Sequence, residues 1–146
     1  MVMKDQLTIF YTDDDLDDLD FFREIVEVIS KDYIVVTQRD ATQLWHALSN
    51  PPPTPYVVFL DINMPGTTGL EILKKVRESG NHGKLPIVMF STTKDRETIE
   101  KSLELGANFY VPKSGIFEQL KRSIEYTLQI NWNSFIPTKD NFVYIH

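Results

Sequence analysis

Short apolar runs alternate along the chain with longer stretches in which apolar residues recur every three or four positions. The run "YVVFL", Tyr56 to Leu60, is apolar at nearly every position, which is typical of a strand buried on both faces of a parallel sheet. Runs of this length that are rich in β-branched and aromatic residues predict strands. The predicted strands are Leu7–Tyr11, Tyr33–Thr37, Tyr56–Leu60, Ile87–Phe90 and Asn108–Val111.

The stretches after these strands carry helical periodicity. Leu19, Phe22, Val26 and Ile29 place apolar side chains on one face of a first helix. The weakest pattern lies around residues 42–48, before the segment "SNPPPTP", whose prolines end a helix and predict an exposed connector. The periodic positions of the later helices are Leu70, Leu73 and Val76, then Ile99 and Leu103, then Phe117, Leu120, Ile124 and Leu128.

Five repeats of strand and helix predict an α/β fold, with one doubly wound parallel sheet covered by helices on both faces. The 146 residues have the length of one domain, and the sequence contains no internal repeat. In such sheets, ligands bind beyond the carboxyl ends of the strands, near the point where the strand order reverses. The residues at those ends are therefore the first candidates for chemistry.

Composition narrows the range of functions. Because the chain has no cysteine, disulfides, thiolate metal sites and a cysteine nucleophile are excluded. A formal net charge of −6 and a pI near 5.0 argue against nucleic acid or an anionic membrane as a partner, since phosphate groups attract clustered Lys and Arg. The sequence has no apolar run long enough to cross a bilayer, and "MVMKDQLTIF" lacks the layout of a signal peptide, so we expect a cytoplasmic protein.

Charged and hydroxyl side chains follow four of the predicted strands. Asp13 and Asp14 follow the first strand and Asp61 the third, while Ser91 and Lys113 follow the fourth and fifth. Three carboxylates at one edge raise each other's pKa unless a cation compensates their charge. Mg²⁺ fits this set of oxygen ligands better than zinc does, because it takes few carboxylates, keeps several waters and adds phosphate oxygens. The sequence therefore predicts a Mg²⁺ site, which could also take Mn²⁺.

The other acidic and imidazole side chains receive an ordinary structural interpretation. Turn formation, helix capping and solvation account for the four remaining aspartates of "YTDDDLDDLD", which are Asp15, Asp17, Asp18 and Asp20. The three histidines lie away from the strand ends and show no ligand spacing, so no role is assigned to His46, His82 or His146.

Four motifs occur in one order along the chain: the pair Asp13-Asp14, "FLDINMPGTTG" from Phe59 to Gly69, "MFSTT" at the end of the fourth strand, and "GANFYVPKS". Together, over about residues 7–130, they resemble the response-regulator receiver domain of two-component signalling. The resemblance implies a flavodoxin-like fold, with a five-stranded parallel sheet in the order 2-1-3-4-5 and five helices. It also implies that the protein accepts a phosphoryl group from a histidine kinase or a phosphotransfer protein.

The resemblance implies a role for each residue at the strand ends. Asp61 is the phosphoacceptor, and Lys113 and Ser91 contact the remaining phosphoryl oxygens. Transfer then depends on position and charge neutralisation, with no general base, because a carboxylate is already ionised at neutral pH. The metal ligands implied are Asp13, Asp14, Asp61 and the backbone carbonyl of Asn63.

Further roles follow from the same resemblance. Ser91 and Tyr110 match a pair that couples movement of the hydroxyl to inward rotation of the aromatic ring. A half-buried strand aromatic is the alternative interpretation of Tyr110. Asn63 and Thr93 occupy positions that tune how long the phosphoryl group lasts. Pro112 resembles a proline that is often cis in the family, and the sequence does not determine its isomer.

The domain organisation expected is a receiver at residues 1–130 followed by an aromatic tail at residues 131–146, with no separate output domain. The tail packs either on the receiver itself or on a partner or second copy, since exposed aromatic patches mark interfaces. We expect a stand-alone phosphoacceptor, not an enzyme, that contacts a downstream protein target. The resemblance places this contact, or a homodimer, on the face formed by the fourth helix, the fifth strand and the fifth helix.

Two other functions fit part of the pattern. A Mg²⁺-dependent aspartyl-phosphate phosphatase of the haloacid-dehalogenase type also uses a strand-end aspartate, but it needs a second aspartate where this chain has Asn63. A receiver kept as an interaction module that works without phosphorylation is the second alternative. The presence of all five key side chains argues against that module without excluding it.

Overall fold

Strands and helices alternate along the chain in the computed structural model, which describes residues 6–52, 56–80 and 82–145. Each strand is followed by a helix, as the periodicity predicted. Within the described residues the order is β1 (Thr8–Thr12), α1 (Leu16–Ile29), β2 (Ile34–Gln38), α2 (Ala41–Ser49), β3 (Tyr56–Leu60), α3 (Gly69–Glu78), β4 (Ile87–Ser91), α4 (Arg96–Glu104), β5 (Phe109–Pro112) and α5 (Phe117–Leu128).

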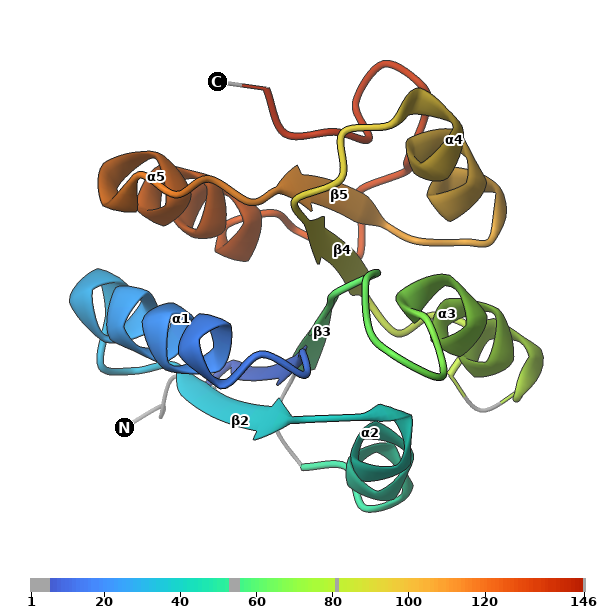
Figure 1. Cartoon of the computed structure of the whole chain (residues 1–146), viewed down its shortest axis with the longest axis horizontal. Coiled ribbons are helices and arrows are strands. Elements are labelled where there is room, and N and C mark those ends of the chain that lie inside the picture. Colours follow the sequence, from blue (N-terminus) through green and yellow to red (C-terminus); the bar gives the residue numbers. More distant parts are fainter. Residues whose placement is uncertain (1–5, 53–55, 81, 146) are drawn as a thin grey trace.

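The strands form one parallel sheet in the order β2-β1-β3-β4-β5. Helices α1 and α5 cover one face of the sheet, and α2, α3 and α4 cover the other (Figure 1). The strand order reverses between β1 and β3, so the loops after these two strands leave toward opposite faces. This arrangement confirms the flavodoxin-like fold and strand order that were predicted, and it puts the candidate site at the switch point.

Two hydrophobic clusters, one on each face of the sheet, hold the layers together. Along β3, Val57 and Phe59 belong to the cluster with α1 and α5, whereas Val58 and Leu60 belong to the cluster with α2 and α3. All four side chains are at most 1% exposed. The period of two in a strand sends successive side chains to opposite faces, which explains why this strand is apolar at every position.

The strand boundaries differ from the predicted ones by one residue at most. β1 and β2 each extend one residue further, to Thr12 and Gln38, and the hydroxyl of Thr12 donates to the amide oxygen of Gln38 at 2.9 Å. A hydrophobic pattern cannot indicate these polar residues, which are buried because they satisfy each other's hydrogen bonds. The predicted connector lies partly outside the described residues, because residues 53–55 are not described, and the same holds for residues 1–5 of the N-terminal segment.

Polar side chains begin four of the helices. Asp15, Asp40, Thr68 and Asp95 each accept a hydrogen bond from a backbone N–H in the first turn of α1, α2, α3 and α4, respectively. Such bonds satisfy amides that have no partner within the helix. The capping role expected for the acidic run is therefore confirmed for Asp15.

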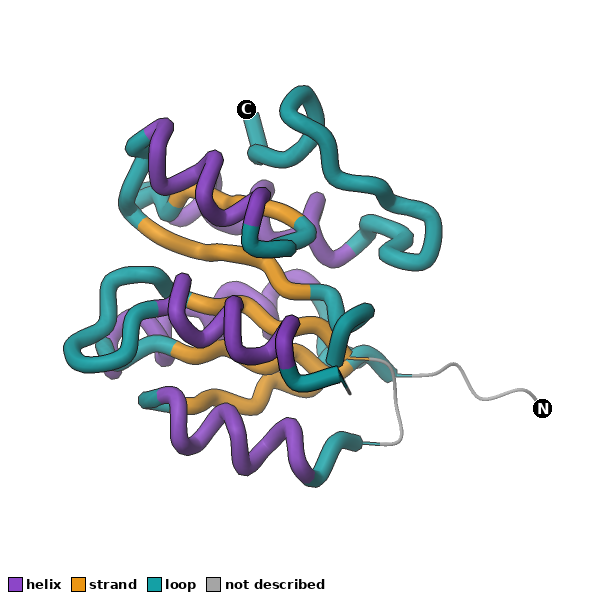
Figure 2. The backbone as a smooth tube through the Cα atoms, turned by 90° about the vertical axis from the view of Figure 1, so that its right-hand side faces the viewer, coloured by secondary structure: helices purple, strands orange, loops and turns teal. Residues whose placement is uncertain are grey.

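The residues after α5 return to the sheet. Figures 1 and 2 show this segment as a long loop that passes α4 and the outer edge of β5 and ends near α5. Phe142 lies in the hydrophobic cluster on the α4 side, whereas Trp132, Phe135 and Tyr144 pack against the cluster on the α5 side. The aromatic tail thus packs on the receiver-like body of its own chain. No helix among the described residues has the length and apolar character that crossing a membrane requires.

Candidate functional site

Backbone hydrogen bonds continue past the strand ends and position three candidate residues. The amides of Asp13, Asp61 and Lys113 each donate to a carbonyl of the neighbouring strand, at 3.0, 3.0 and 2.8 Å. Each of these residues is the first one after its strand, so the sheet fixes its Cα position. The three side chains therefore start from one edge of the sheet, as the strand ends predicted.

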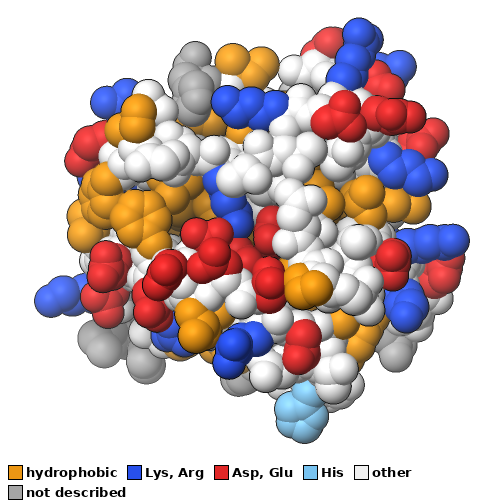
Figure 3. Space-filling model, viewed as in Figure 1, with side chains coloured by type: hydrophobic (Ala, Val, Ile, Leu, Met, Phe, Trp, Pro, Cys, Tyr) orange, Lys and Arg blue, Asp and Glu red, His pale blue; other side chains and the backbone are white. Residues whose placement is uncertain are grey.

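The ammonium group of Lys113 lies between three acidic side chains. Its Nζ lies 2.7 Å from Asp13 Oδ2, 3.0 Å from Asp18 Oδ2 and 3.7 Å from Asp61 Oδ1. The lysine side chain is only 10% exposed, and those of Asp13 and Asp61 are 1% and 8% exposed. A band of acidic side chains crosses the face of the molecule seen in Figure 3. One ammonium group therefore serves several carboxylates.

A group of carboxylates fits a hard divalent cation. Asp13, Asp14 and Asp61 each offer one oxygen, and these oxygens lie within 4.8 Å of one another. Asp14 is exposed, which gives an ion access from solvent, while the other two are buried. Lys113 neutralises only part of this charge, so the all-oxygen set fits the Mg²⁺ that was predicted. The three carboxylates are the residues that would hold it.

The surroundings shift the pKa of each charged group at this edge. Burial, with a contribution from the Asp13 charge, raises the pKa of Asp61 to about 6, although Lys113 opposes the shift. Burial acts in the same direction on Asp13, but hydrogen bonds from Lys113, Tyr11 and the Asp15 amide outweigh it and hold that pKa below its usual value. Burial alone would lower the pKa of Lys113, but the surrounding carboxylates outweigh burial, so that the pKa lies above its usual value. The lysine therefore stays charged.

Sequence reasoning missed two residues of this site. Asp18 was interpreted as a solvated residue of a helix start, but its carboxylate accepts a hydrogen bond from Lys113 at 3.0 Å. Tyr11 is completely buried, and its hydroxyl donates to Asp13. The position of Asp18 in the first turn of α1, beside the strand ends, was the available signal. No sequence pattern indicates that the hydroxyl of a core tyrosine reaches Asp13.

Hydrogen bonds join the remaining candidate residues in a second group. The amide of Asn63 donates to Ser91 Oγ at 3.4 Å and to Thr93 Oγ1 at 3.0 Å. The hydroxyl of Tyr110 donates to the carbonyl of Thr93 at 2.6 Å. Hydrogen bonds from the backbone of Asn63 and Ile62 reach the carboxylate of Asp61. The structure thus brings together every residue that the sequence singled out.

The structure determines the burial of Tyr110 and the isomer of Pro112. Tyr110 is completely buried, not half-buried, and burial raises its pKa to about 12. Among the described residues, which include Pro112, no peptide bond is cis. Neither His46 nor His82 belongs to the carboxylate group, and His146 lies outside the described residues.

The close approach of α3 to the loop after β3 requires glycine at residue 69. A Cβ there would lie 2.8 Å from the Cα of Ile62 and even closer to the carbonyl oxygen of Asp61. Both contacts are with backbone, which cannot rotate away. We expect Gly69→Ala to lower the free energy of unfolding by about 1–3 kcal/mol, as overpacking does, and to displace Asp61. Urea unfolding at neutral pH measures this loss.

Gly83→Ala is the matched control for this prediction, because nothing lies within 4 Å of the added Cβ. We expect it to change stability by less than about 0.5 kcal/mol. Equal stability of the two variants would show that α3 can move away without affecting the loop that carries Asp61.

Comparison with known proteins places this site in a family. The sequence model of the response regulator receiver domain matches residues 9–125, which is most of the chain. The chain belongs to this family. It is a receiver domain of two-component signalling, as the motifs had indicated.

The receiver resembles several characterised proteins. It is 33% identical over 75 residues to the chemotaxis protein CheY1 of Helicobacter pylori, a match that covers 51% of this chain and 60% of CheY1. It is 30% identical over 93 residues to the response regulator RppA of Synechocystis, covering 64% of this chain and 39% of RppA. The chain therefore spans less than two thirds of the curated relatives it matches.

A solved structure agrees over more of the chain. The phosphorylated cyanobacterial phytochrome response regulator RcpA superposes with a TM-score of 0.74 and 26% identity, covering 90% of this receiver and 97% of RcpA. This coverage extends the likeness in fold beyond the segment matched in the two sequence comparisons.

Proposed function

We propose that this receiver accepts a phosphoryl group on Asp61 from a histidine kinase or a phosphotransfer protein. The observation that carries the proposal is the position of Asp61 between Lys113, whose Nζ is 3.7 Å from Asp61 Oδ1, and the oxygens of Asp13 and Asp14 within 4.8 Å. A nucleophilic carboxylate, a cation and metal-binding oxygens are the parts that phosphoryl transfer needs.

In the proposed transfer, Asp61 attacks the phosphorus of a phosphohistidine. A bond forms between a carboxylate oxygen and phosphorus, and the bond between phosphorus and the imidazole nitrogen breaks, leaving the electron pair on the imidazole. Ion pairs with Asp13 and Asp18 hold Lys113 beside Asp61. In this position its charge stabilises the phosphoryl oxygens. Ser91, which is completely buried beside Asn63, supplies a hydroxyl.

Mg²⁺ is the proposed cofactor, with Mn²⁺ as a substitute, and when bound it neutralises charge on the phosphoryl oxygens. Asp13 and Asp14 would hold it together with Asp61 and the backbone carbonyl of Asn63. Asn63 and Thr93 share a hydrogen bond of 3.0 Å at the open side of the site. We propose that they set the lifetime of the aspartyl phosphate by controlling the approach of water.

The proposed output is contact with a protein, controlled by phosphorylation, on the face formed by α4, β5 and α5. Ser91 and Tyr110 are the proposed switch residues, because Ser91 ends β4 and the loop that follows it carries Thr93, whose carbonyl accepts a hydrogen bond from Tyr110. A homodimer through this face is a further proposal. Any partner there meets the tail, which lies along β5.

The direct test incubates the protein with Mg²⁺ and acetyl phosphate and measures intact mass. We expect an adduct of about 80 Da, the mass of one phosphoryl group on a carboxylate nucleophile. Turnover of small phosphate esters without an adduct would favour the phosphatase alternative. Absence of both reactions, and of beryllofluoride binding, would favour an interaction module that works without phosphorylation.

Metal binding should appear as a gain in stability. At Mg²⁺ about 100 times above its dissociation constant, preferential binding to the native state adds about 2.7 kcal/mol. The double change Asp13→Asn, Asp14→Asn should abolish most of this gain, because it removes the charge of two of the three grouped carboxylates. Thermal unfolding with Mg²⁺ and with EDTA measures the gain.

Asp32→Asn is the matched control, since this exposed aspartate lies between α1 and β2, away from the metal-binding oxygens. It should keep the full response to Mg²⁺. The metal assignment fails if the double variant is stabilised as much as the wild type and the control.

A further inference from the structure

The tail binds the outer edge of β5 through its backbone. The amide of Tyr110 donates to the carbonyl of Phe142, and the amide of Tyr144 donates to the carbonyl of Tyr110, each at 2.9 Å. These bonds form a parallel bridge between Tyr110 and Val143. Since β5 is at the end of the sheet order, residues 138–145, here named the strap, occupy an edge that would otherwise present free backbone groups.

Aromatic side chains of the strap pack against the body on both sides of this edge. Phe142 is 1% exposed and its ring centroid lies 6.3 Å from that of Tyr110, which is itself completely buried. On the α5 side, the ring of Tyr144 lies 5.4 Å from that of Tyr126. Any outward rotation of the Tyr110 ring would therefore have to displace Phe142. The strap restrains Tyr110 by both its backbone and its ring.

Tyr110 also bonds to the loop that enters the phosphoacceptor site. Its hydroxyl donates to the carbonyl of Thr93 at 2.6 Å, and the Thr93 amide donates to Ser91 Oγ at 3.3 Å. The hydroxyls of Ser91 and Thr93 both accept hydrogen bonds from the amide of Asn63, which follows Asp61 by two residues. One residue thus contacts the strap on one side and the site on the other.

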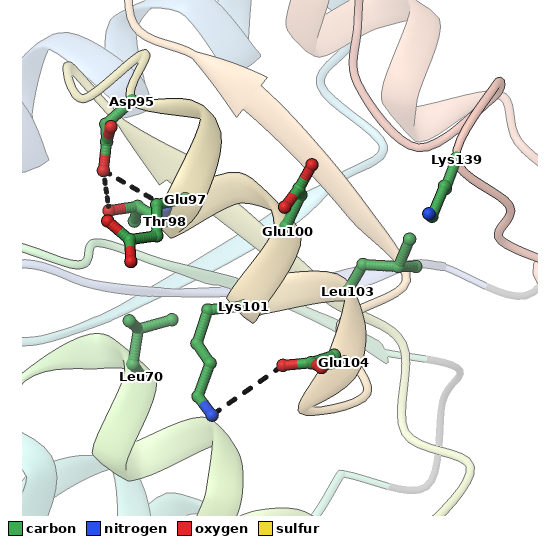
Figure 4. Close-up of a pocket in the computed structure, with 9 residues that line it drawn as sticks. All are labelled: Leu70, Asp95, Glu97, Thr98, Glu100, Lys101, Leu103, Glu104 and Lys139. Carbon is green, nitrogen blue, oxygen red and sulfur yellow. Dashed lines mark hydrogen bonds and ion pairs between the residues drawn. The ribbon is translucent and has the colours of Figure 1, made fainter.

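Helix α4 contributes few fully buried side chains to this part of the structure. Of the residues in α4, only Ser102 is buried. A groove of about 650 Å³ runs along α4, lined by Leu70 of α3, by residues of α4 including Leu103, and by Lys139 of the strap (Figure 4). Ile99 and Leu103 of this helix are only partly buried against the core, so α4 holds the loop before it less firmly than a deeply buried helix would. The contacts of the strap with Tyr110 therefore influence the position of that loop more than they would beside a firmly packed helix.

We propose that the strap stabilises the arrangement of Tyr110, Ser91 and Thr93 that receives the phosphoryl group, so that strap docking and phosphoryl binding strengthen each other. The inference rests on the proposed function of Asp61 and adds an intramolecular ligand to it. Coupling between two sites is reciprocal: a strap that strengthens phosphoryl binding must itself be held more firmly when the site is occupied.

Beryllofluoride with Mg²⁺ is the probe for this coupling, because it imitates a phosphoryl group on a carboxylate. In calorimetric titrations, Phe142→Ala should weaken beryllofluoride binding by about fivefold or more, the low end of couplings between sites. Ile145→Ala is the matched control within the same strap, since Ile145 is 80% exposed, and it should bind as the wild type does. In the wild type, beryllofluoride should slow hydrogen exchange at the amide of Tyr144.

Tyr110→Phe separates coupling from a general loss of stability, because it keeps the ring and removes only the hydroxyl that bonds to Thr93. In this background, Phe142→Ala should change beryllofluoride affinity by less than about twofold, as expected when two sites no longer interact. Cooperative urea unfolding of each variant establishes that it is folded.

The outcomes separate this inference from the function on which it rests. If the wild type binds beryllofluoride and Phe142→Ala binds it equally well or more tightly, the strap does not support the site and the inference is wrong. A fivefold effect of Phe142→Ala that persists in the Tyr110→Phe background would overturn the connection through the Tyr110 hydroxyl and Thr93. If the wild type binds no beryllofluoride and forms no adduct, the proposed function of Asp61 fails as well.

Discussion

Asp61→Asn is expected to abolish phosphorylation while leaving the receiver folded. The amide keeps the shape of the carboxylate but cannot act as the nucleophile, so the adduct of about 80 Da should be absent under conditions that label the wild type. The carboxylate is 8% exposed, and burial together with the charge of Asp13 raises its pKa to about 6. Removing one of several repelling charges should therefore leave the apo protein at least as stable as the wild type.

The control for this experiment changes a different aspartate, one that belongs to the acidic run but lies outside the site. Asp20 is exposed on α1 and has no contact with Lys113 among the hydrogen bonds and ion pairs described. Asp20→Asn should form the adduct as the wild type does. Intact mass followed by peptide mapping identifies the modified residue, and an adduct that persists in Asp61→Asn would place the phosphoacceptor elsewhere.

Lys113→Met is expected to cause the largest loss of stability among the substitutions considered. The ammonium group donates to Asp13 at 2.7 Å, and the side chains of this pair are only 10% and 1% exposed. Breaking a buried pair leaves an uncompensated charge and costs about 3–5 kcal/mol. The hydroxyl of Tyr11 and the amide of Asp15 still donate to Asp13, so we expect a loss of about 3 kcal/mol, at the low end of that range.

Two measurements distinguish this electrostatic effect from a packing effect. Saturating Mg²⁺ should reduce the loss in Lys113→Met, because the ion replaces the missing positive charge beside the same carboxylates. Lys101→Met removes a lysine from an exposed pair at 3.8 Å, with side chains 56% and 73% exposed, and should change stability by less than about 1 kcal/mol. A small loss in Lys113→Met, equal to that control, would mean that Asp13 does not depend on the lysine.

The acidic run at the end of β1 divides into three structural roles. Asp15 begins α1 by accepting hydrogen bonds from two amides of the first turn. Asp13 and Asp14 contribute oxygens to the proposed metal site, and Asp18 accepts a hydrogen bond from Lys113 on the side of α1. One short stretch therefore starts a helix and supplies most of the site's negative charge, while its positive partner, Lys113, follows β5, 100 positions after Asp13.

The tail changes what the expected output face looks like. The resemblance placed partner contact on α4, β5 and α5, and the chain's own strap occupies the β5 edge of that face. A partner either binds over the strap or displaces it. Displacement would uncover Phe142 and Tyr110, the two most completely buried aromatic rings of that edge, which links partner binding to the site through the same residue.

The sequence alone determined the fold and the chemical character of the site. Alternation of apolar runs and helical periodicity is a local property, because it follows from burial on the faces of each element, and it predicted every strand within one residue. Parallel strands then bring their carboxyl ends to one edge. The convergence of Asp13, Asp61, Ser91 and Lys113 therefore followed from the sequence as soon as the strands were assigned.

Tertiary structure alone decided which side chains contact each other at that edge. Lys113 bonds to Asp18 across 95 positions of sequence, and Tyr110 bonds to the strap, because packing of α1, α5 and the tail sets those distances. The sequence left the tail free to pack on its own body or on a partner, since an aromatic side chain is buried equally well by either. The tail packs on its own chain because β5 is the last strand of the sheet, and the backbone groups on its outer edge need hydrogen-bond partners. The backbone of the tail lies within reach and supplies these partners.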